Sequence, residues 1–202
     1  KYYEDYILKN YTLDDLTSKY VNGMATMVVM YIKLFEEFNL DVISAECWTA
    51  TPVMFDGLAP CTVYGILNDM GYMVSCESDM HCALTMALLK SATLGKGKPL
   101  FGEFTVRHPE NKNAELLWHC GPFPVSCKAE GEHPCLYSCK PSFRIKDGTY
   151  TIARFQAERG KYYLLGGEIK TCKGPKTFGT YMWAEFKDLP KVERKLVEGP
   201  YI

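Results

Sequence analysis

The residues of this chain best suited to chemistry are two glutamates and a histidine at the ends or interruptions of apolar segments. Glu77 directly follows the apolar run 72–76 and stands just before a helix-like segment that opens at Asp79. Glu103 interrupts the apolar sequence PLFGEFTV, and His119 closes the apolar sequence ELLWH. Two carboxylates and one imidazole form a ligand set that suits divalent manganese or magnesium. The residue types therefore raise the hypothesis of a divalent metal site.

The position of Glu77 in the predicted fold also favours a role in ligand binding. Ligands of open parallel sheets bind beyond the carboxyl ends of the strands, and Glu77 lies at such an end if 72–76 is a strand. The following helix terminus would also favour an anion there. Each of the three residues has an ordinary structural alternative as well: Glu77 as a solvated glutamate that helps to cap the helix, Glu103 as an outward-facing strand residue, and His119 as a packed, hydrogen-bonded histidine.

The first half of the chain shows the alternation of helix and strand that is typical of a parallel α/β sheet. Apolar residues recur at steps of three and four from Leu16 to Tyr31, which predicts a helix over 13–39 with Thr12 as its cap. A short strand is expected within 40–48, and a second helix over 62–71, where Gly71 can end it in the left-handed conformation.

The next two elements would place Glu77 between a strand and a helix. Residues 72–76 predict the strand, and Asp79 is a suitable cap for the helix. The spacing of the apolar residues that follow predicts that one face of this helix carries Met80, Ala83, Leu84, Ala87 and Leu88.

The pattern changes after the linker-like sequence GKGKP at 95–99. The segments 99–107, 114–120, 142–155, 161–170 and 180–186 are all rich in strand-forming residues. Asp147 and Gly148 stand between two such runs, as in a type I′ hairpin. The expected fold class is α/β followed by mainly β: part of a parallel α/β sheet domain at 1–97, carrying Glu77, and an antiparallel, β-barrel-like domain at 98–202.

The composition of the chain argues against nucleic acid and membranes as partners and favours a reducing compartment. The 202 residues are 47% hydrophobic, and 23 basic against 24 acidic residues leave a net charge of −1, which provides no long-range attraction for nucleic acid or an anionic membrane. The longest apolar run, 24–32, is far shorter than the roughly 20 residues of a membrane span. No signal peptide opens the chain, and a start at Lys1 suggests a piece of something longer. Nine cysteines, an odd number, are expected to be reduced in the cytoplasm.

Several motifs taken in order resemble one enzyme family. The sequences AECWTATP, CESDMHCALTM, FGEFT and HPENKNAELLWHCG closely resemble those of the L-fucose isomerase-like proteins, whose superfamily includes L-arabinose isomerase. The resemblance runs from about Glu46 to the carboxyl terminus. It implies α/β domains followed by a β-barrel-like domain, which agrees with the organisation expected above. It also implies continuation beyond residue 202 into a segment that bears a further histidine.

The resemblance also implies a metal, a reaction and an assembly. In such isomerases a divalent ion, usually Mn²⁺, is held by two acidic residues and histidine. Glu77 matches the glutamate after the strand, Glu103 matches the second acid, and His119 matches a histidine of the arabinose branch, whereas the fucose branch uses a later histidine. The implied activity is aldose–ketose isomerisation of a monosaccharide through an enediol, by a homo-oligomer that is a trimer or a hexamer. Without the other domains, this chain is expected to bind metal weakly.

The resemblance suggests roles for individual residues. Glu77 would move the proton between C2 and C1 of the sugar, and Glu103 would serve as ligand and second acid/base. Trp48 could present an apolar face to the sugar, or could equally be a half-buried core residue.

Two other classes of protein stay open. Cys120, Cys127, His133, Cys135 and Cys139 offer thiolate and imidazole ligands for structural Zn²⁺, although they lack paired C-x-x-C spacing. A non-catalytic sugar-binding relative would keep the fold without turnover.

Overall fold

The computed structural model describes residues 1–187, so the end of the predicted second domain, 188–202, lies outside the described residues. Helices dominate the first half of the described chain: α1 (Tyr2–Asn10), α2 (Asp15–Lys19), α3 (Val21–Phe38), α4 (Ala50–Met54), α5 (Cys61–Met70) and α6 (Met80–Ala92). Strands β2 (Val42–Ser44) and β3 (Met73–Ser75) pair in parallel between them. The expected α/β pattern of the first half is confirmed, with β2 shorter than the segment predicted for it.

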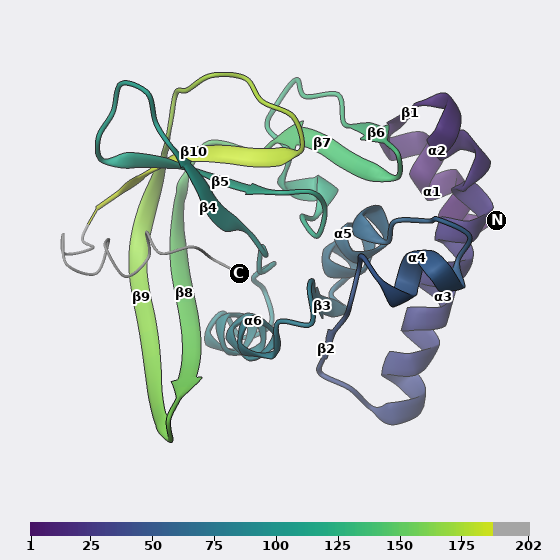
Figure 1. Ribbon diagram of the computed structural model, residues 1–202, viewed down its shortest axis with the longest axis horizontal. Helices are drawn as coiled ribbons and strands as arrows, with labels where there is room; N and C mark the ends of the chain where they lie inside the picture. The colour runs from purple at the N-terminus through teal and green to yellow at the C-terminus, as the bar shows by residue number, and fades with distance from the viewer. Residues whose placement is uncertain (188–202) are drawn as a thin grey trace.

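The second half forms a mixed sheet together with β1, a short strand near the amino terminus. Its strands are β1 (Thr12–Leu13), β4 (Glu103–Arg107), β5 (Ala114–His119), β6 (Cys135–Tyr137), β7 (Lys140–Arg144), β8 (Thr149–Glu158), β9 (Lys161–Cys172) and β10 (Thr180–Phe186). The order is β1-β6-β7-β10-β5-β4, and β9 also pairs with β10 and with β8. Most pairs are antiparallel, but β7 with β10 and β1 with β6 are parallel. The described strands make no closed barrel. Figure 1 shows β4, β5 and β10 above the long β8–β9 hairpin.

The single helix predicted over 13–39 is wrong in its first part. Thr12 does not cap a helix but pairs in β1 with Cys135 of β6. The cap lies two residues later, where Asp14 accepts the backbone N–H of Thr17 at the start of α2. Helix α3 ends as predicted, with Asn39 in the left-handed conformation at φ 47°. Pairing with a strand more than a hundred residues away has displaced the local helical preference.

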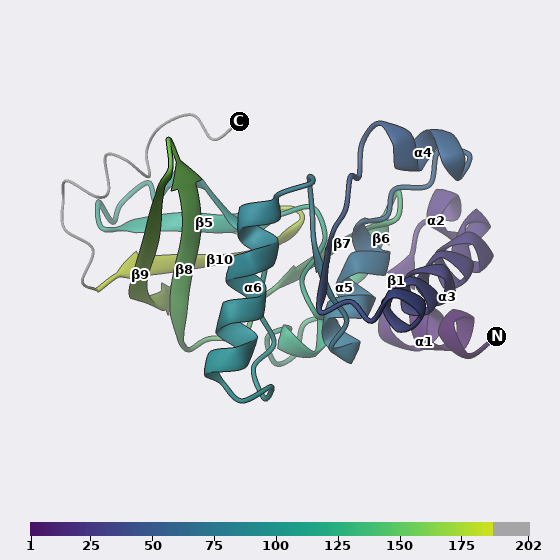
Figure 2. The same ribbon diagram turned by 90° about the horizontal axis from the view of Figure 1, so that it is seen from below.

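The predicted termini of α5 and α6 are confirmed. Gly71 ends α5 at φ 95°, and the Asp79 carboxylate accepts the N–H of Cys82 at the start of α6. The predicted apolar face of α6 is only partly buried. Ala83 is buried, whereas Met80, Leu84 and Leu88 are largely exposed. Helix α6 lies against β8 (Figure 2), where its Thr85 hydroxyl accepts the N–H of Phe155.

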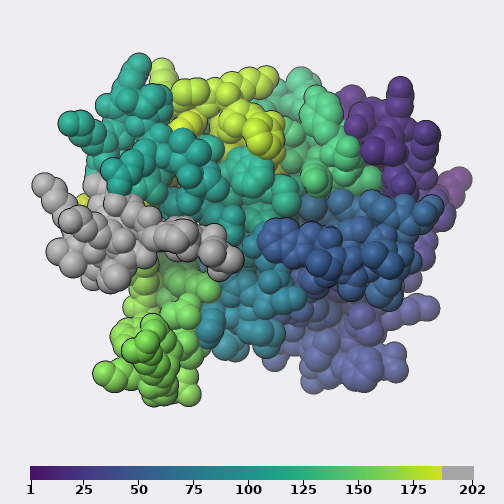
Figure 3. All heavy atoms as spheres, in the orientation of Figure 1, coloured from purple at the N-terminus to yellow at the C-terminus, as the bar shows by residue number. Residues whose placement is uncertain are grey.

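The hairpin predicted at Asp147 and Gly148 is wrong. Those residues join β7 to β8, which do not pair with each other, and neither has the positive φ that a type I′ turn requires. Among the described residues, Ser138 and Cys139, with φ of 50° and 62°, form a two-residue hairpin loop between β6 and β7. Arg159 and Gly160, with φ of 48° and 74°, form another between β8 and β9. The tip of this hairpin stands clear of the remaining surface in Figure 3.

One buried apolar cluster extends across the predicted domain boundary. It contains Ile7 and Leu67 from the first half together with Phe123, Ile145 and Met182 from the second. The division at 97 and 98 stays a prediction, although GKGKP does form a turn and loop as expected. Among the described residues, no helix combines the length and the hydropathy that crossing a membrane demands.

Asp69, at the end of α5, ties several segments together. Its carboxylate accepts hydrogen bonds from Tyr6 of α1, from Lys98 of the linker, and from both the N–H and the hydroxyl of Ser126. Although desolvation opposes the charge, the hydrogen bonds from Lys98 and Ser126 hold the pKa of Asp69 below its usual value. The folded state therefore binds this proton less tightly than the unfolded state.

That difference predicts an acid-dependent contribution to stability. A lowered folded-state pKa stabilises above the unfolded value of roughly 4, and the contribution is lost as the pH falls through the folded value. We expect Asp69→Asn to lower the free energy of unfolding by about 1–3 kcal/mol at neutral pH, and by progressively less below pH of about 4. Urea titrations across this range measure the difference, and a constant difference at all pH values would contradict the assignment.

Candidate metal centre

The backbone around Glu77 adopts an unusual conformation. Glu77 and Ser78 both lie in the left-handed region, with φ of 61° and 56°. Two consecutive non-glycine residues in this region cost of order 1–3 kcal/mol each. Two backbone hydrogen bonds hold this turn. The N–H of Ser78 donates to the carbonyl of Ala45, and the N–H of Asp79 donates to the carbonyl of Cys76. The end of β3 is thus fixed against the end of β2, and the following carboxylate is Glu77.

The other two residues come from one antiparallel strand pair. Glu103 is the first residue of β4 and His119 the last residue of β5, and the register of the two strands sets Glu103 opposite Trp118. Neighbouring positions in such a ladder lie close to each other. Glu103 and His119 therefore reach the same end of the strand pair.

A buried amide links the strand that leads to Glu77 with the loop that follows His119. The side chain of Asn68, which is 3% exposed, accepts the N–H of Val74 at 2.7 Å and donates to the carbonyl of Val74 at 3.1 Å. It also donates to the carbonyl of Pro122 at 2.9 Å. One side chain on α5 therefore holds β3 and the loop after β5 at a set separation.

The structure brings Glu77, Glu103 and His119 together. One ligand atom from each lies within 4.8 Å of those of the other two. The imidazole Nε2 of His119 is 3.8 Å from Oε1 of Glu77, and His119 is 1% exposed. This Nε2 has no hydrogen-bond partner. The packed, hydrogen-bonded histidine that the sequence left open is therefore confirmed only in part: the ring is buried, but its Nε2 has no partner.

Charge in this cluster is unbalanced. Desolvation, and then the nearby Glu103, raise the pKa of Glu77 above its usual value. Burial opposes a positive charge on His119, but Cys120 and the two glutamates outweigh burial and raise its pKa overall. Two carboxylates that face one buried imidazole form a site that is stabilised by positive charge, whether from a proton or from an ion.

The cluster fits a divalent cation by two observations. A buried ring nitrogen without a partner would leave a polar atom desolvated at a cost of about 1–3 kcal/mol, and a metal ion supplies the missing interaction. Two oxygen donors and one nitrogen donor suit manganese or magnesium, whereas thiolate-rich sets select softer ions. Ions of this kind also take several further oxygen ligands from water or substrate.

The second ring nitrogen of His119 contacts a thiol that the sequence did not suggest as part of this site. Nδ1 lies 3.6 Å from Sγ of Cys120, which in turn lies 3.7 Å from Sγ of Cys61. The Cys61 thiol, and then His119, lower the pKa of Cys120 below that of an ordinary thiol, although desolvation opposes this. Cys120 stood out in the sequence only as a possible zinc ligand, and nothing local links it to Cys61.

Two other predicted sites do not join the cluster. Trp48 lies in the loop after β2 and is 67% exposed, so the half-buried core alternative is wrong. Its contact with a sugar stays a prediction. Within residues 1–187, the cysteines and histidine of the proposed zinc site do not come together as a ligand group. Cys127 and Cys139 are buried, and the thiol of Cys135 donates to the carbonyl of His133.

Comparison with known proteins supports a sugar isomerase. No family model matches the chain. Sulfoquinovose isomerase from Priestia megaterium is 32% identical over 145 residues, which cover 67% of this chain and 31% of that protein. Sulfoquinovose isomerase from Alkalicoccus urumqiensis is 30% identical over 138 residues, 64% of this chain and 30% of that protein. A third sulfoquinovose isomerase, from Clostridium sp., is 27% identical over 163 residues, which cover 69% of this chain and 35% of that protein.

These relatives define the class to which the chain is similar. All three are named as isomerases of one sugar, which agrees with the activity implied by the sequence motifs, while the L-fucose and L-arabinose specificity implied there goes beyond the match. The chain spans about a third of the length of these curated relatives.

The role of Asn68 can be tested by its removal. We expect Asn68→Ala to lower the free energy of unfolding by about 2–4 kcal/mol, because the N–H of Val74 and two buried carbonyls lose their partner. Asn22→Ala is the matched control, since Asn22 makes one exposed hydrogen bond to Glu4, and its effect should stay within about 0.5 kcal/mol. Urea denaturation measures both, and equal effects would refute the anchoring role.

The metal centre can be tested by calorimetry with Mn²⁺. We expect Glu77→Gln, Glu103→Gln and His119→Ala each to weaken binding at least about tenfold, which corresponds to ~1.4 kcal/mol, because each removes one ligand. The exposed Glu130 provides the control, and Glu130→Gln should bind as the parent does. Equal affinity in the parent and in all three ligand variants would exclude these residues as ligands.

Proposed function

We propose that this chain carries the metal centre of an aldose–ketose isomerase in which Glu77, Glu103 and His119 hold a divalent ion, Mn²⁺ in the first instance. The observation that carries the proposal is the buried, unpartnered Nε2 of His119 beside two carboxylates. The relatives named sulfoquinovose isomerase support the reaction class, because interconversion of an aldose and a ketose is the isomerisation that a site of this kind serves.

The bound ion would polarise the oxygens on C1 and C2 of the open-chain sugar and stabilise the negative charge that develops on them. The protein's own groups move the protons. Each carboxylate has two oxygens, so one oxygen can serve as a ligand while the other exchanges a proton. We assign to Glu77 the transfer between C2 and C1, and to Glu103 the role of second acid/base.

His119 has a different task in this proposal. It is the most buried of the three residues, and its ring lies edge-on to Phe101 with centroids 5.0 Å apart. Such packing limits rotation of the imidazole. The ring can therefore present Nε2 in one direction while Nδ1 contacts Cys120. His119 orients the ion and leaves proton transfer to the carboxylates.

We propose a sulfonated monosaccharide as the substrate to test first. The support is the name shared by the relatives from Priestia and Alkalicoccus. L-Fucose and L-arabinose are the alternatives, because they follow from the motif resemblance. The expected homo-oligomer, a trimer or a hexamer, is part of the same proposal, since a neighbouring subunit could complete the sugar pocket.

Isomerase activity is the direct test. The complete protein, freed of metal and reloaded with Mn²⁺, is incubated with sulfoquinovose, L-fucose or L-arabinose, and ketose formation is followed by NMR. We expect one sugar to be converted and Glu77→Gln to lower kcat by about 10²–10⁴-fold, the usual range for loss of a general acid/base. Glu130→Gln should retain full activity.

Two results would overturn this assignment in different ways. Full activity in Glu77→Gln and Glu103→Gln would place the chemistry elsewhere in the protein. Binding of Mn²⁺ and sugar without any conversion of the three sugars would favour the non-catalytic sugar-binding relative. Exchange of the C2 proton of the sugar with solvent deuterium distinguishes a slow isomerase from a protein that only binds the sugar. It detects proton removal even when the ketose does not accumulate.

A further inference from the structure

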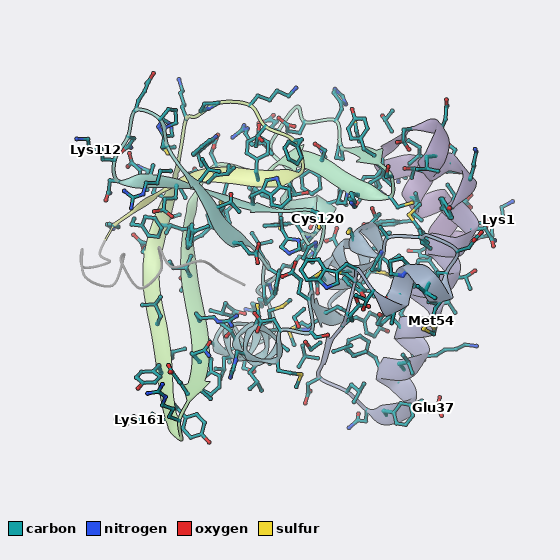
Figure 4. All side chains as sticks on the ribbon, in the orientation of Figure 1. Lys1, Glu37, Met54, Lys112, Cys120 and Lys161 are labelled. Carbon is teal, nitrogen blue, oxygen red and sulfur yellow. The ribbon has the colours of Figure 1, made fainter. Side chains whose placement is uncertain are left out.

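Two thiols meet beside the metal centre although they are 59 positions apart in the chain. Cys61 is the first residue of α5, and Cys120 directly follows β5. Their Sγ atoms are 3.7 Å apart, which is van der Waals contact between sulfurs. Figure 4 labels Cys120 near the middle of the molecule, where the end of β5 faces α5.

The backbone of Gly121, the residue directly after Cys120, is also in close contact with Cys61. A Cβ atom added at Gly121 would overlap the side chain of Cys61 and come within 2.6 Å of its Cα. Gly65, one turn further along α5, packs in the same way, since an added Cβ would lie 2.8 Å from the carbonyl oxygen of Phe123. Absence of a side chain at both glycines lets residues 120–123 lie directly on α5. The loop that begins with Cys120 is therefore held against the turn of α5 that contains Cys61.

The surroundings of the pair favour reaction at Cys120. Cys120 is partly exposed, whereas Cys61 is 3% exposed. The imidazole Nδ1 of His119 and the Cys61 thiol both lie within hydrogen-bond reach of the Cys120 sulfur. An accessible thiol in contact with a buried second thiol is the arrangement of an oxidised and a resolving cysteine.

We propose that Cys61 and Cys120 form a reversible disulfide when the protein meets a peroxide. The Cys120 thiolate attacks one oxygen of hydrogen peroxide, the O–O bond breaks, and the products are a sulfenic acid on Cys120 and hydroxide, which takes up a proton to give water. The Cys61 sulfur then attacks the Cys120 sulfur, displaces its hydroxyl group, and gives up its own proton so that a second water leaves. Peroxide gains two electrons, and each sulfur loses one.

The disulfide would also change the metal centre. Bond formation requires the two sulfurs to approach well inside their present 3.7 Å, and the sulfur of Cys120 then no longer offers a thiolate to Nδ1 of His119. Loss of the outer partner of a metal-bound histidine typically weakens metal binding 10–100-fold. This second consequence rests on the proposed function, whereas the disulfide itself does not.

Peptide mapping tests the disulfide directly. The complete, metal-free protein is treated with hydrogen peroxide, the remaining thiols are alkylated, and peptides are mapped by mass spectrometry without reduction. We expect a Cys61–Cys120 cross-link that dithiothreitol reverses. Cys61→Ser should prevent the link and leave a sulfenic acid on Cys120 that dimedone traps, whereas Cys135→Ser should form the link as the parent does.

The outcomes separate the two parts of the inference. No cross-link, a cross-link between other cysteines instead, or irreversible oxidation of Cys120 alone in the parent would overturn the proposal. Calorimetry of the oxidised parent with Mn²⁺ should show about 10–100-fold weaker binding, restored by dithiothreitol. A reversible link with unchanged Mn²⁺ affinity keeps the disulfide and refutes its influence on the metal centre. A link in a protein that does not bind Mn²⁺ in either state counts against the proposed function alone.

Discussion

The structure depends on keeping two carboxylates beside a buried imidazole whose Nε2 has no hydrogen-bond partner. Glu77 and Glu103 repel each other, and burial makes that repulsion stronger than it would be in water. Nε2 of His119 adds a desolvated polar atom at the same point. A chain that only had to fold would gain by separating these groups. Their convergence is therefore a cost of the fold, and a cation bound among them, as proposed, would offset it.

The rest of the architecture can be understood as support for that convergence. Glu77 follows β3 of the parallel pair β2–β3, whereas Glu103 and His119 belong to the antiparallel pair β4–β5. These two strand pairs belong to separate sheets, so no ladder of backbone hydrogen bonds joins them. Asn68 provides the connection through a fully satisfied buried amide, and contact of α5 with residues 120–123 reinforces it. A site that spans two sheets thus obtains its precision from one helix.

Much of the local structure was predictable because short-range chemistry decides it. The left-handed Gly71 ends α5, and Asp79 caps α6, since each conformation or hydrogen bond involves only a few neighbouring residues. Strands β4, β5 and β10 fall within segments whose composition predicts them, and β9 covers the predicted segment 161–170 and extends to Cys172. The three residues proposed as metal ligands were also suggested in advance, because a polar side chain at the end of an apolar run is visible without knowledge of the fold.

Sequence by itself therefore determined which residues are the candidates for chemistry and which short elements present them. The tertiary structure decided which of these elements and side chains come into contact. Thr12 pairs with β6 instead of capping the predicted helix, and Asp147 joins β7 to β8, which pairs with β9. Strand partners are selected by available edges and shared burial, which involve residues far apart in the chain. The same holds for the Cys61–Cys120 contact and for the unpartnered nitrogen of His119. Each depends on groups far apart in the chain, which local propensity and periodicity do not encode.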